Sequence, residues 1–213
     1  HEIVHQWFGN HATEKSFAHL WLSEGFATYL THIYMESKYG TDSLNKRMKA
    51  DRETVLDFVK TSKRPVVDTT QNFMKLLNPN SYQKGSWVLH MLRRQLGDAV
   101  FHKSIRDYYT VYRGKNADTK DLQRIFETNS GRKLDPFFRQ WLYTPENLRL
   151  DITWKYNKKE KNIAVTVNQL QSSGSFQFPF ELLIRESPDS MPKRIIKTVT
   201  KRTETFLFPV RSK

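Results

Sequence analysis

The chain contains no cysteine among its 213 residues. This absence excludes disulfide bonds and thiolate metal ligands. It leaves the redox compartment open, because a cysteine-free chain fits a reducing cytosol and an exported bacterial protein equally well. Any metal site in the sequence is therefore expected to use nitrogen and oxygen ligands.

Long hydrophobic runs are absent as well. No segment approaches the roughly 18–20 apolar residues that a helix needs to cross a bilayer, so no membrane span is expected in this chain. Runs of about five to eight basic residues are also missing, although the net charge is +13. The excess charge is spread over both halves of the chain, which favours a solvated basic surface and gives no reason to expect a nucleic-acid partner.

Bulky side chains, in contrast, are plentiful. Hydrophobic residues make up 38% and aromatic residues 13% of the chain, with 14 Phe, 9 Tyr and 5 Trp. This supply is enough to fill a core and excludes intrinsic disorder. The first five residues lie inside an amphipathic helical pattern and do not include an initiator methionine, so we expect the sequence to be a fragment of a longer protein. Its localisation and oligomeric state stay open.

The period of the hydrophobic pattern changes near Pro145, from helical spacing to strict alternation. This change predicts an α+β protein with a mainly helical domain over residues 1–146 and a small antiparallel β-sandwich over residues 147–213. Glycines are expected to end the helices and polar side chains to cap their starts. A loop is expected over 63–80. The helices are expected to begin near Trp21, Thr41/Asp42, Ser81, Asp98, Thr119 and Asp135. Five alternating segments predict the strands, around 148–156, 163–167, 176–180, 194–200 and 205–208.

One group of residues predicts a metal site. His1 and His5 lie four positions apart, so on a helix both imidazoles project from one face, about 40° apart. Glu2 lies about 100° round the same helix, where its carboxylate can reach a water held by the metal. Eighteen residues separate His5 from Glu24, whose carboxylate can reach the ion if the two helices pack antiparallel. Two neutral histidines and one carboxylate leave a fourth position open for water, as in catalytic zinc sites.

These residues, together with several flanking motifs, resemble the aminopeptidase N-like zinc metallopeptidases, a gluzincin family that includes membrane alanyl aminopeptidase and leukotriene hydrolase. The resemblance extends over nearly the whole chain, and Ser23 departs from the asparagine that the family commonly has there. The motifs that carry it are His1-Glu2-x-x-His5-x-Trp7-x-x-Asn10, Trp21-Leu22-x-Glu24-Gly25-Phe26-Ala27, Tyr82-x-Lys84-Gly85 and Gly131-x-x-Leu134-x-x-Phe137-Phe138-x-Gln140-Trp141-Leu142.

The resemblance implies a fold, a cofactor and roles for five residues. Residues 1–146 are expected to form the helical C-terminal half of a thermolysin-like catalytic domain, and residues 147–213 an Ig-like sandwich that lacks its last strand. His1, His5 and Glu24 are implied to bind one Zn²⁺ ion, Glu2 to act as general base, and Tyr82 to stabilise the oxyanion. The implied activity is aminopeptidase hydrolysis of peptide substrates by metal-activated water.

Three alternatives remain open at the level of sequence. The chain could serve as a binding module whose basic surface contacts an acidic partner or nucleic acid. Within the family, an epoxide hydrolase is not separated from a peptidase, because the Gly-x-Met-Glu-Asn segment and the acidic residues that hold a substrate amine are not in this sequence. For the same reason the isolated chain is expected to be weakly active or inactive. The remaining histidines, at 11, 19, 32, 90 and 102, are expected to be surface or packing residues.

Overall fold

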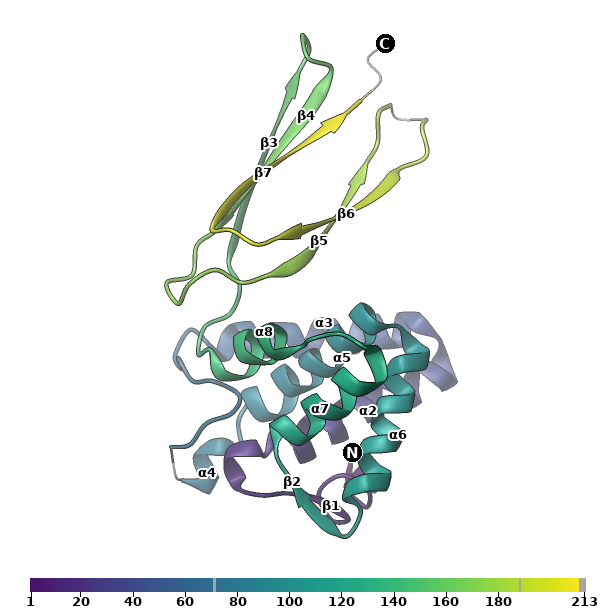
Figure 1. Cartoon of the computed structure of the whole chain (residues 1–213), viewed down its shortest axis with the longest axis vertical. Helices are drawn as coiled ribbons and strands as arrows, with labels where there is room; N and C mark the ends of the chain where they lie inside the picture. The colour runs from purple at the N-terminus through teal and green to yellow at the C-terminus, as the bar shows by residue number, and fades with distance from the viewer. Residues whose placement is uncertain (71, 188, 211–213) are drawn as a thin grey trace. The chain divides into compact units, whose positions relative to one another are not determined.

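The computed structural model describes residues 1–70, 72–187 and 189–210, and it divides into two compact units, His1–Pro145 and Glu146–Lys213. The first unit is mainly helical and the second is built of strands (Figure 1). The chain is therefore an α+β protein. Among the described residues, no helix is both long enough and apolar enough to cross a membrane.

The helical unit combines α-helices with shorter turns, and its described residues include a small parallel sheet. In this sheet β1 (Ala12–Glu14) pairs with β2 (Lys115–Ala117). One turn, η1, is a 3₁₀-helix, whereas η2 and η3 are π-helical. The helical elements are α1 (Glu2–His5), η1 (Phe17–His19), α2 (Trp21–Tyr39), α3 (Thr41–Phe58), α4 (Phe73–Leu76), η2 (Asn80–Lys84), α5 (Gly85–Leu96), α6 (Asp98–Tyr112), α7 (Thr119–Ser130), α8 (Asp135–Phe138) and η3 (Arg139–Tyr143).

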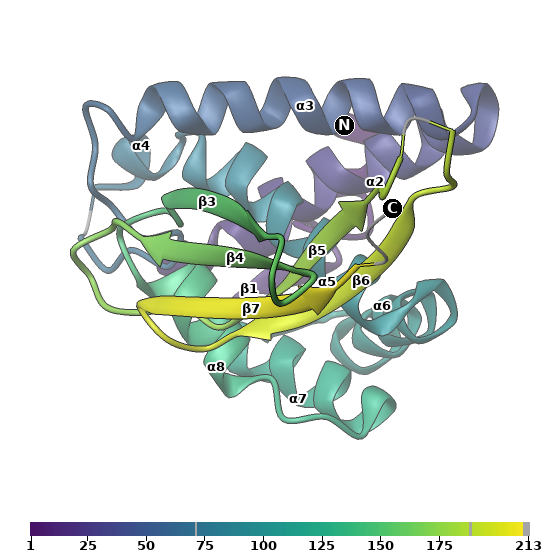
Figure 2. The same ribbon diagram turned by 90° about the horizontal axis from the view of Figure 1, so that it is seen from above.

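Helix α2 lies at the centre of this unit. Trp21, Phe26 and Tyr29 of α2 are completely buried, and Phe26 stacks on Phe8 and Tyr108. Figure 2 shows α3 as a long helix along one side of the unit, with α2 and α5 beside it. The central position of α2 holds its first turn, which carries Glu24, in a fixed place.

Two of the predicted helix caps, at Thr41 and Asp98, are wrong because a glycine precedes each helix directly. Gly40 and Gly97 have positive φ angles of 81° and 86°, and each glycine ends one helix and directly precedes the next. Thr41 and Asp98 are therefore already the first helical residues of α3 and α6, and neither helix has a side-chain cap. The expected loop over 63–80 also contains α4, which Asn72 caps by accepting a hydrogen bond from the Met74 amide.

Over residues 146–187 and 189–210, the second unit forms five strands in two antiparallel sheets. One sheet has the order β3 (Leu150–Asn157), β4 (Asn162–Gln169) and β7 (Thr203–Pro209), and the other pairs β5 (Phe178–Ile184) with β6 (Lys193–Val199). The register places Trp154 opposite Val165, and Val165 opposite Phe206. Buried residues come from both sheets, namely Val165, Val167 and Phe208 from the first and Phe178, Phe180 and Val199 from the second.

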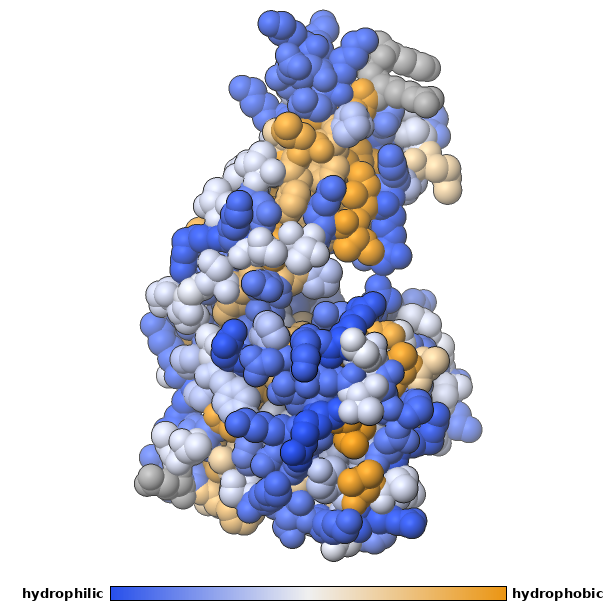
Figure 3. Space-filling model, viewed as in Figure 1, coloured by the Kyte–Doolittle hydropathy of each residue, from blue (hydrophilic) through white to orange (hydrophobic). Residues whose placement is uncertain are grey.

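Strand β3 is more exposed than its alternating pattern suggests. Ile152, Trp154 and Tyr156 share a face with the buried residues of β4, yet Trp154 is 70% exposed. Figure 3 shows hydrophobic residues gathered at the surface of this unit. The alternation predicted the strand correctly but did not predict how far its apolar face is covered.

Two buried glutamines hold the ends of the strands together. Gln169 donates to the carbonyl oxygens of Phe176 and Lys201, both at 2.9 Å, and accepts from the Phe176 amide at 2.7 Å. Gln171 donates to Gln169 at 2.7 Å. These bonds connect the end of β4 to the segments that lead into β5 and β7.

Replacing Gln169 by leucine is expected to lower the free energy of unfolding of this unit by about 3 kcal/mol, because several buried backbone groups lose their partner and each costs roughly 1–3 kcal/mol. Chemical denaturation measures the change. Asn168→Leu, one residue away on the opposite face of β4, is the matched control and is expected to change stability by about 0.5 kcal/mol or less. Equal effects of the two substitutions would contradict the role assigned to Gln169.

Candidate metal site

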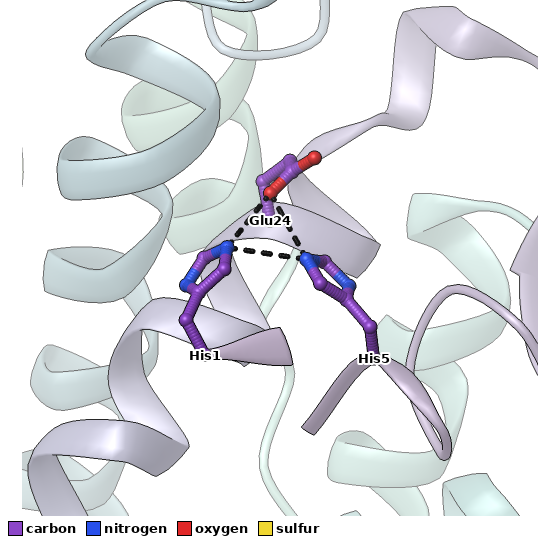
Figure 4. A group of neighbouring side chains, drawn as sticks. All are labelled: His1, His5 and Glu24. Atoms are coloured by element: carbon purple, nitrogen blue, oxygen red, sulfur yellow. Dashed lines mark hydrogen bonds and ion pairs between the residues drawn. The ribbon is translucent and has the colours of Figure 1, made fainter. Parts of the chain in front are cut away.

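Three side chains from two helices converge on one point. His1 and His5 come from the first turn of the chain, at α1, and Glu24 comes from the first turn of α2 (Figure 4). The His1 and His5 Nε2 atoms are 3.1 Å apart, and Glu24 Oε2 lies 3.2 Å from His1 Nε2 and 3.3 Å from His5 Nε2. Among the described residues, this is the one group of three or more histidine or acidic side chains arranged closely enough to hold a metal ion.

A backbone carbonyl fixes the orientation of His5. His5 Nδ1 lies 3.0 Å from the carbonyl oxygen of Phe8, which can only accept a hydrogen bond, so Nδ1 carries the proton. In the neutral ring, Nε2 then presents its lone pair to the cluster. Gly9 makes this possible, because a Cβ at this position would lie 3.0 Å from His5 Nδ1, and its φ of +123° disfavours any other residue.

Glu24 is held by the start of α2 and by the strand beside it. Its neighbour Ser23 is buried and donates a hydrogen bond to Glu14 of β1. Thr28 donates to the Glu24 carbonyl oxygen at 2.7 Å. The serine that departs from the usual family pattern therefore has its own partner and ties α2 to β1.

The donor atoms fit a tetrahedral ion. With bonds of about 2.0–2.1 Å, two ligand atoms of a tetrahedral zinc site lie about 3.3–3.4 Å apart. The three observed separations, 3.1, 3.2 and 3.3 Å, are close to this value. Two imidazole nitrogens and a carboxylate oxygen also form the nitrogen and oxygen donor set that suits zinc, and three ligands are one fewer than a tetrahedral ion takes.

Tyr82 and Glu2 lie beside this cluster. The Tyr82 ring stacks on His1 with 5.9 Å between ring centroids. Burial raises the pKa of Tyr82 to about 12, helped by the charge of Glu24, a hydrogen bond with Glu24 and the charge of Glu2. The phenol thus keeps its proton near neutral pH and can donate it in a hydrogen bond. Glu2 is exposed in the first turn of α1.

The other histidines lie outside this group. His11 contacts the Tyr109 hydroxyl, His19 the Thr119 hydroxyl and His90 the Tyr29 hydroxyl. His32 pairs with Asp51 at 2.9 Å, and His102 packs against the Phe101 ring. The structure thus brings together His1, His5 and Glu24, with Tyr82 and Glu2 next to them. Of the remaining histidines, His11 is exposed and the others are buried or half-buried.

Three glycines shape the site in a way that was not predicted from the sequence. Gly25 and Gly85 belong to the motifs quoted above but were given no role there, and Gly9 was not singled out. Gly9 approaches His5, and Gly25 of α2 lies directly against Gly85 of α5. A glycine inside a helix costs about 1 kcal/mol relative to alanine, so the two helical glycines were a usable signal of a close backbone approach.

The fold and the site define a helical domain in which two histidines and one glutamate lie closely enough to hold a metal ion. The sequence profile described as "Peptidase family M1 domain" matches residues 1–141. The chain is 34% identical over 149 residues to Aminopeptidase M1 of Arabidopsis thaliana, covering 66% of this chain and 16% of that protein.

Solved structures are similar as well. Aminopeptidase A of Legionella pneumophila, crystallised with aspartic acid, aligns with 98% of this chain and 23% of its own at a TM-score of 0.78 and 19% identity, which concerns the fold alone. A variant of the M1 zinc metallopeptidase of Deinococcus radiodurans, bound to a Tyr-Ser-Ala substrate, aligns with 69% of this chain and 32% of its own at a TM-score of 0.58 and 27% identity.

The chain belongs to peptidase family M1. It spans only 16% of the length of the plant aminopeptidase that it matches. Family membership therefore applies to the matched residues, and the activity of the whole protein is a matter for proposal.

Proposed function

We propose that this chain contributes the metal-binding and proton-transferring residues of a zinc aminopeptidase that removes N-terminal residues from peptides. The observation that carries the proposal is the convergence of His1 Nε2, His5 Nε2 and Glu24 Oε2 within 3.1–3.3 Å of one another. Membership in a peptidase family and similarity to proteins named aminopeptidases support the choice of reaction.

His1, His5 and Glu24 would hold a single zinc ion through these three atoms. A bound zinc ion lowers the pKa of a coordinated water to about 7 and polarises the scissile carbonyl. The hydrogen bond from His5 Nδ1 to Phe8 keeps the other ring nitrogen free for the metal. The residues 147–213 would accompany this catalytic part as an Ig-like sandwich.

Glu2 would act as the general base. Its carboxylate is exposed on the same helical turn as both histidines, so an attacking water can reach it. The carboxylate accepts a proton from this water and then passes the proton to the leaving amine nitrogen. Positioned proton transfer of this kind contributes about 10²–10⁴-fold to the rate.

Tyr82 would stabilise the charge that develops on the carbonyl oxygen. Its pKa of about 12 keeps the hydroxyl protonated, so that it can donate a hydrogen bond to this oxygen. Donors of this type are worth about 2.7–4 kcal/mol of transition-state stabilisation. Tyr82 acts on the substrate from the side of the cluster where its ring stacks on His1.

Replacing Glu2 by glutamine tests the mechanism. In the natural polypeptide that carries this chain, Glu2→Gln is expected to lower kcat for an aminoacyl chromogenic substrate by about 10³-fold or more, because glutamine cannot accept the proton. Zinc content, measured by elemental analysis, is expected to remain at the wild-type level.

Glu53→Gln, the same change at an exposed position of α3, is the control and should leave kcat unchanged. A substrate with a blocked α-amine is expected to resist hydrolysis, because an aminopeptidase requires the free amine. Unimpaired turnover by Glu2→Gln would refute the mechanism, and hydrolysis of the blocked substrate would refute the aminopeptidase assignment.

A further inference from the structure

Gly25 and Gly85 lie against each other where α2 crosses the start of α5. A Cβ added to Gly25 would lie 3.0 Å from both the Cα and the carbonyl carbon of Gly85. A Cβ added to Gly85 would lie 3.1 Å from Gly25 Cα. Non-bonded carbons are normally about 3.5–4.0 Å apart, so a methyl group on either side would push the two backbones apart by roughly 0.5–1 Å.

The close approach explains why glycine stands at these two positions. Both glycines have helical backbone, where glycine is less favourable than alanine. Neither residue has a positive φ, so backbone freedom is not the reason for glycine at these positions. What glycine provides at these two positions is the absence of a side chain, which lets the two backbones lie in contact.

The crossing joins the two halves of the candidate site. Glu24 immediately precedes Gly25, and the carbonyl oxygen of Ser81, next to Tyr82, would lie 3.3 Å from a Cβ on Gly25. The ligand residues His1, His5 and Glu24 all lie on α1 and α2, whereas Tyr82 comes from η2, which continues directly into α5. The distance between Tyr82 and the ligands therefore depends on how closely η2 and α5 approach α2.

The π-helical form of η2 adds to this dependence. The Lys84 amide donates to the Pro79 carbonyl oxygen at 2.9 Å, five residues earlier, so the turn contains one residue more than an α-helical turn. An extra residue changes the direction of preceding side chains relative to the following helix by about 100°. The turn and the glycine contact together fix where the Tyr82 hydroxyl lies relative to Glu24.

We infer that Gly25 and Gly85 are positioning residues, whose contact sets how closely the Tyr82 side chain approaches the metal-ligand cluster. The inference rests on the proposed function for its effect on catalysis. Its structural part, the dependence of the Tyr82–Glu24 interaction on the glycine contact, is independent of the reaction.

Gly85→Ala tests this inference in the natural polypeptide that carries the chain. The variant is expected to lower kcat about 10–100-fold with KM changed less than about threefold, because an oxyanion donor contributes about 10²–10³-fold to kcat. Zinc affinity is expected to stay within about threefold of wild type, since the three ligands lie on the other side of the crossing. In a Tyr82→Phe background, Gly85→Ala is expected to cause almost no further loss of kcat.

A second readout needs no metal and no substrate. In the metal-free chain, Tyr82→Phe is expected to lower the thermal midpoint because the favourable interaction of the phenol with the Glu24 carboxylate is lost. In the Gly85→Ala background this decrease is expected to disappear. This comparison separates the inference from the proposed function, since it holds or fails whether or not the protein hydrolyses peptides.

Ser86→Ala is the matched control, because Ser86 is fully buried next to Gly85 but contacts Met48 of α3. It is expected to leave kcat and the effect of Tyr82→Phe unchanged. If Gly85→Ala does not fold, Gly25→Ala repeats the test from the other side of the contact. Wild-type kcat in the folded glycine variant, or losses that multiply with those of Tyr82→Phe, would overturn the inference.

Discussion

Replacing Glu24 by alanine is expected to lower the affinity of the chain for zinc by about a thousandfold, because one of three protein ligands and its negative charge are removed. At a free zinc concentration a thousand times the wild-type Kd, zinc stabilises the wild-type fold by about 4 kcal/mol. The same concentration is expected to stabilise Glu24→Ala by less than about 1 kcal/mol. Competition with a chelating indicator measures the affinity, and denaturation with and without zinc measures the stabilisation.

Glu53→Ala provides the control for this experiment, because Glu53 is exposed on α3 and lies in the same helical unit. It should bind zinc like wild type. Wild-type zinc affinity in Glu24→Ala would show that the three convergent side chains do not form the metal site.

Replacing Lys84 by methionine is expected to stabilise the fold by up to about 3 kcal/mol at pH 7. Lys84 is only 4% exposed, and its Nζ has no hydrogen-bond partner among the described residues. Burial lowers its pKa from 10.5 to about 8, and each pKa unit corresponds to about 1.36 kcal/mol. Methionine has a similar length and carries no charge, so it removes the desolvation cost.

The pH dependence follows from the direction of this shift. Between about pH 8 and 10.5 the unfolded chain keeps the Lys84 proton while the folded chain has lost it, so the free energy of unfolding rises with pH in this window. Below pH 8 both states are protonated and the destabilisation is fully present. The difference in stability between Lys84→Met and wild type is therefore expected to shrink as pH rises from 8 to 10.5.

Lys46→Met, at an exposed position of α3, is the control and is expected to show neither the stabilisation nor the pH dependence. Chemical denaturation at pH 7, 9 and 10.5 gives the three values needed for each variant. A destabilised Lys84→Met at pH 7 would mean that the ammonium has a compensating partner, contrary to the burial argument.

Helix ends marked by glycine were predictable from the sequence, whereas the caps were not. Gly40, Gly97 and Gly131 adopt positive φ and end α2, α5 and α7, as their position after apolar stripes indicates. Asp98 was expected to cap α6, but it lies within the first turn and forms an ion pair with Arg93 at 2.9 Å. A sequence pattern does not distinguish a cap from a first-turn acidic residue when a single glycine links two helices.

The region around Tyr82 shows a similar limit. Ser81 was expected to cap a helix, but its hydroxyl donates to the Leu76 carbonyl oxygen inside the π-helical turn η2. Hydrophobic spacing identifies a helix in this region, but it contains no signal for the extra residue in the turn. The turn leads into the close contact between Gly25 and Gly85, which involves two segments far apart in the sequence.

The candidate ligands could be predicted from the sequence because their arrangement depends on one short helix and on the helix that packs against it. The spacing of His1 and His5 places them on one helical face, and the position of Glu24 requires only that α1 and α2 pack together. The orientation of His5 was not accessible, since it depends on the Phe8 carbonyl and on the absence of a side chain at Gly9. Backbone approaches of this kind leave no periodic pattern.

Zinc K-edge X-ray absorption of the purified chain with one equivalent of zinc tests the central claim most directly. We expect about four nitrogen or oxygen ligands at about 2.0–2.1 Å, together with the outer-shell scattering of two imidazoles. In His5→Ala, this imidazole scattering is expected to fall by about half. A six-oxygen spectrum typical of hydrated zinc, or a spectrum unchanged in His5→Ala and Glu24→Ala, would contradict the claim.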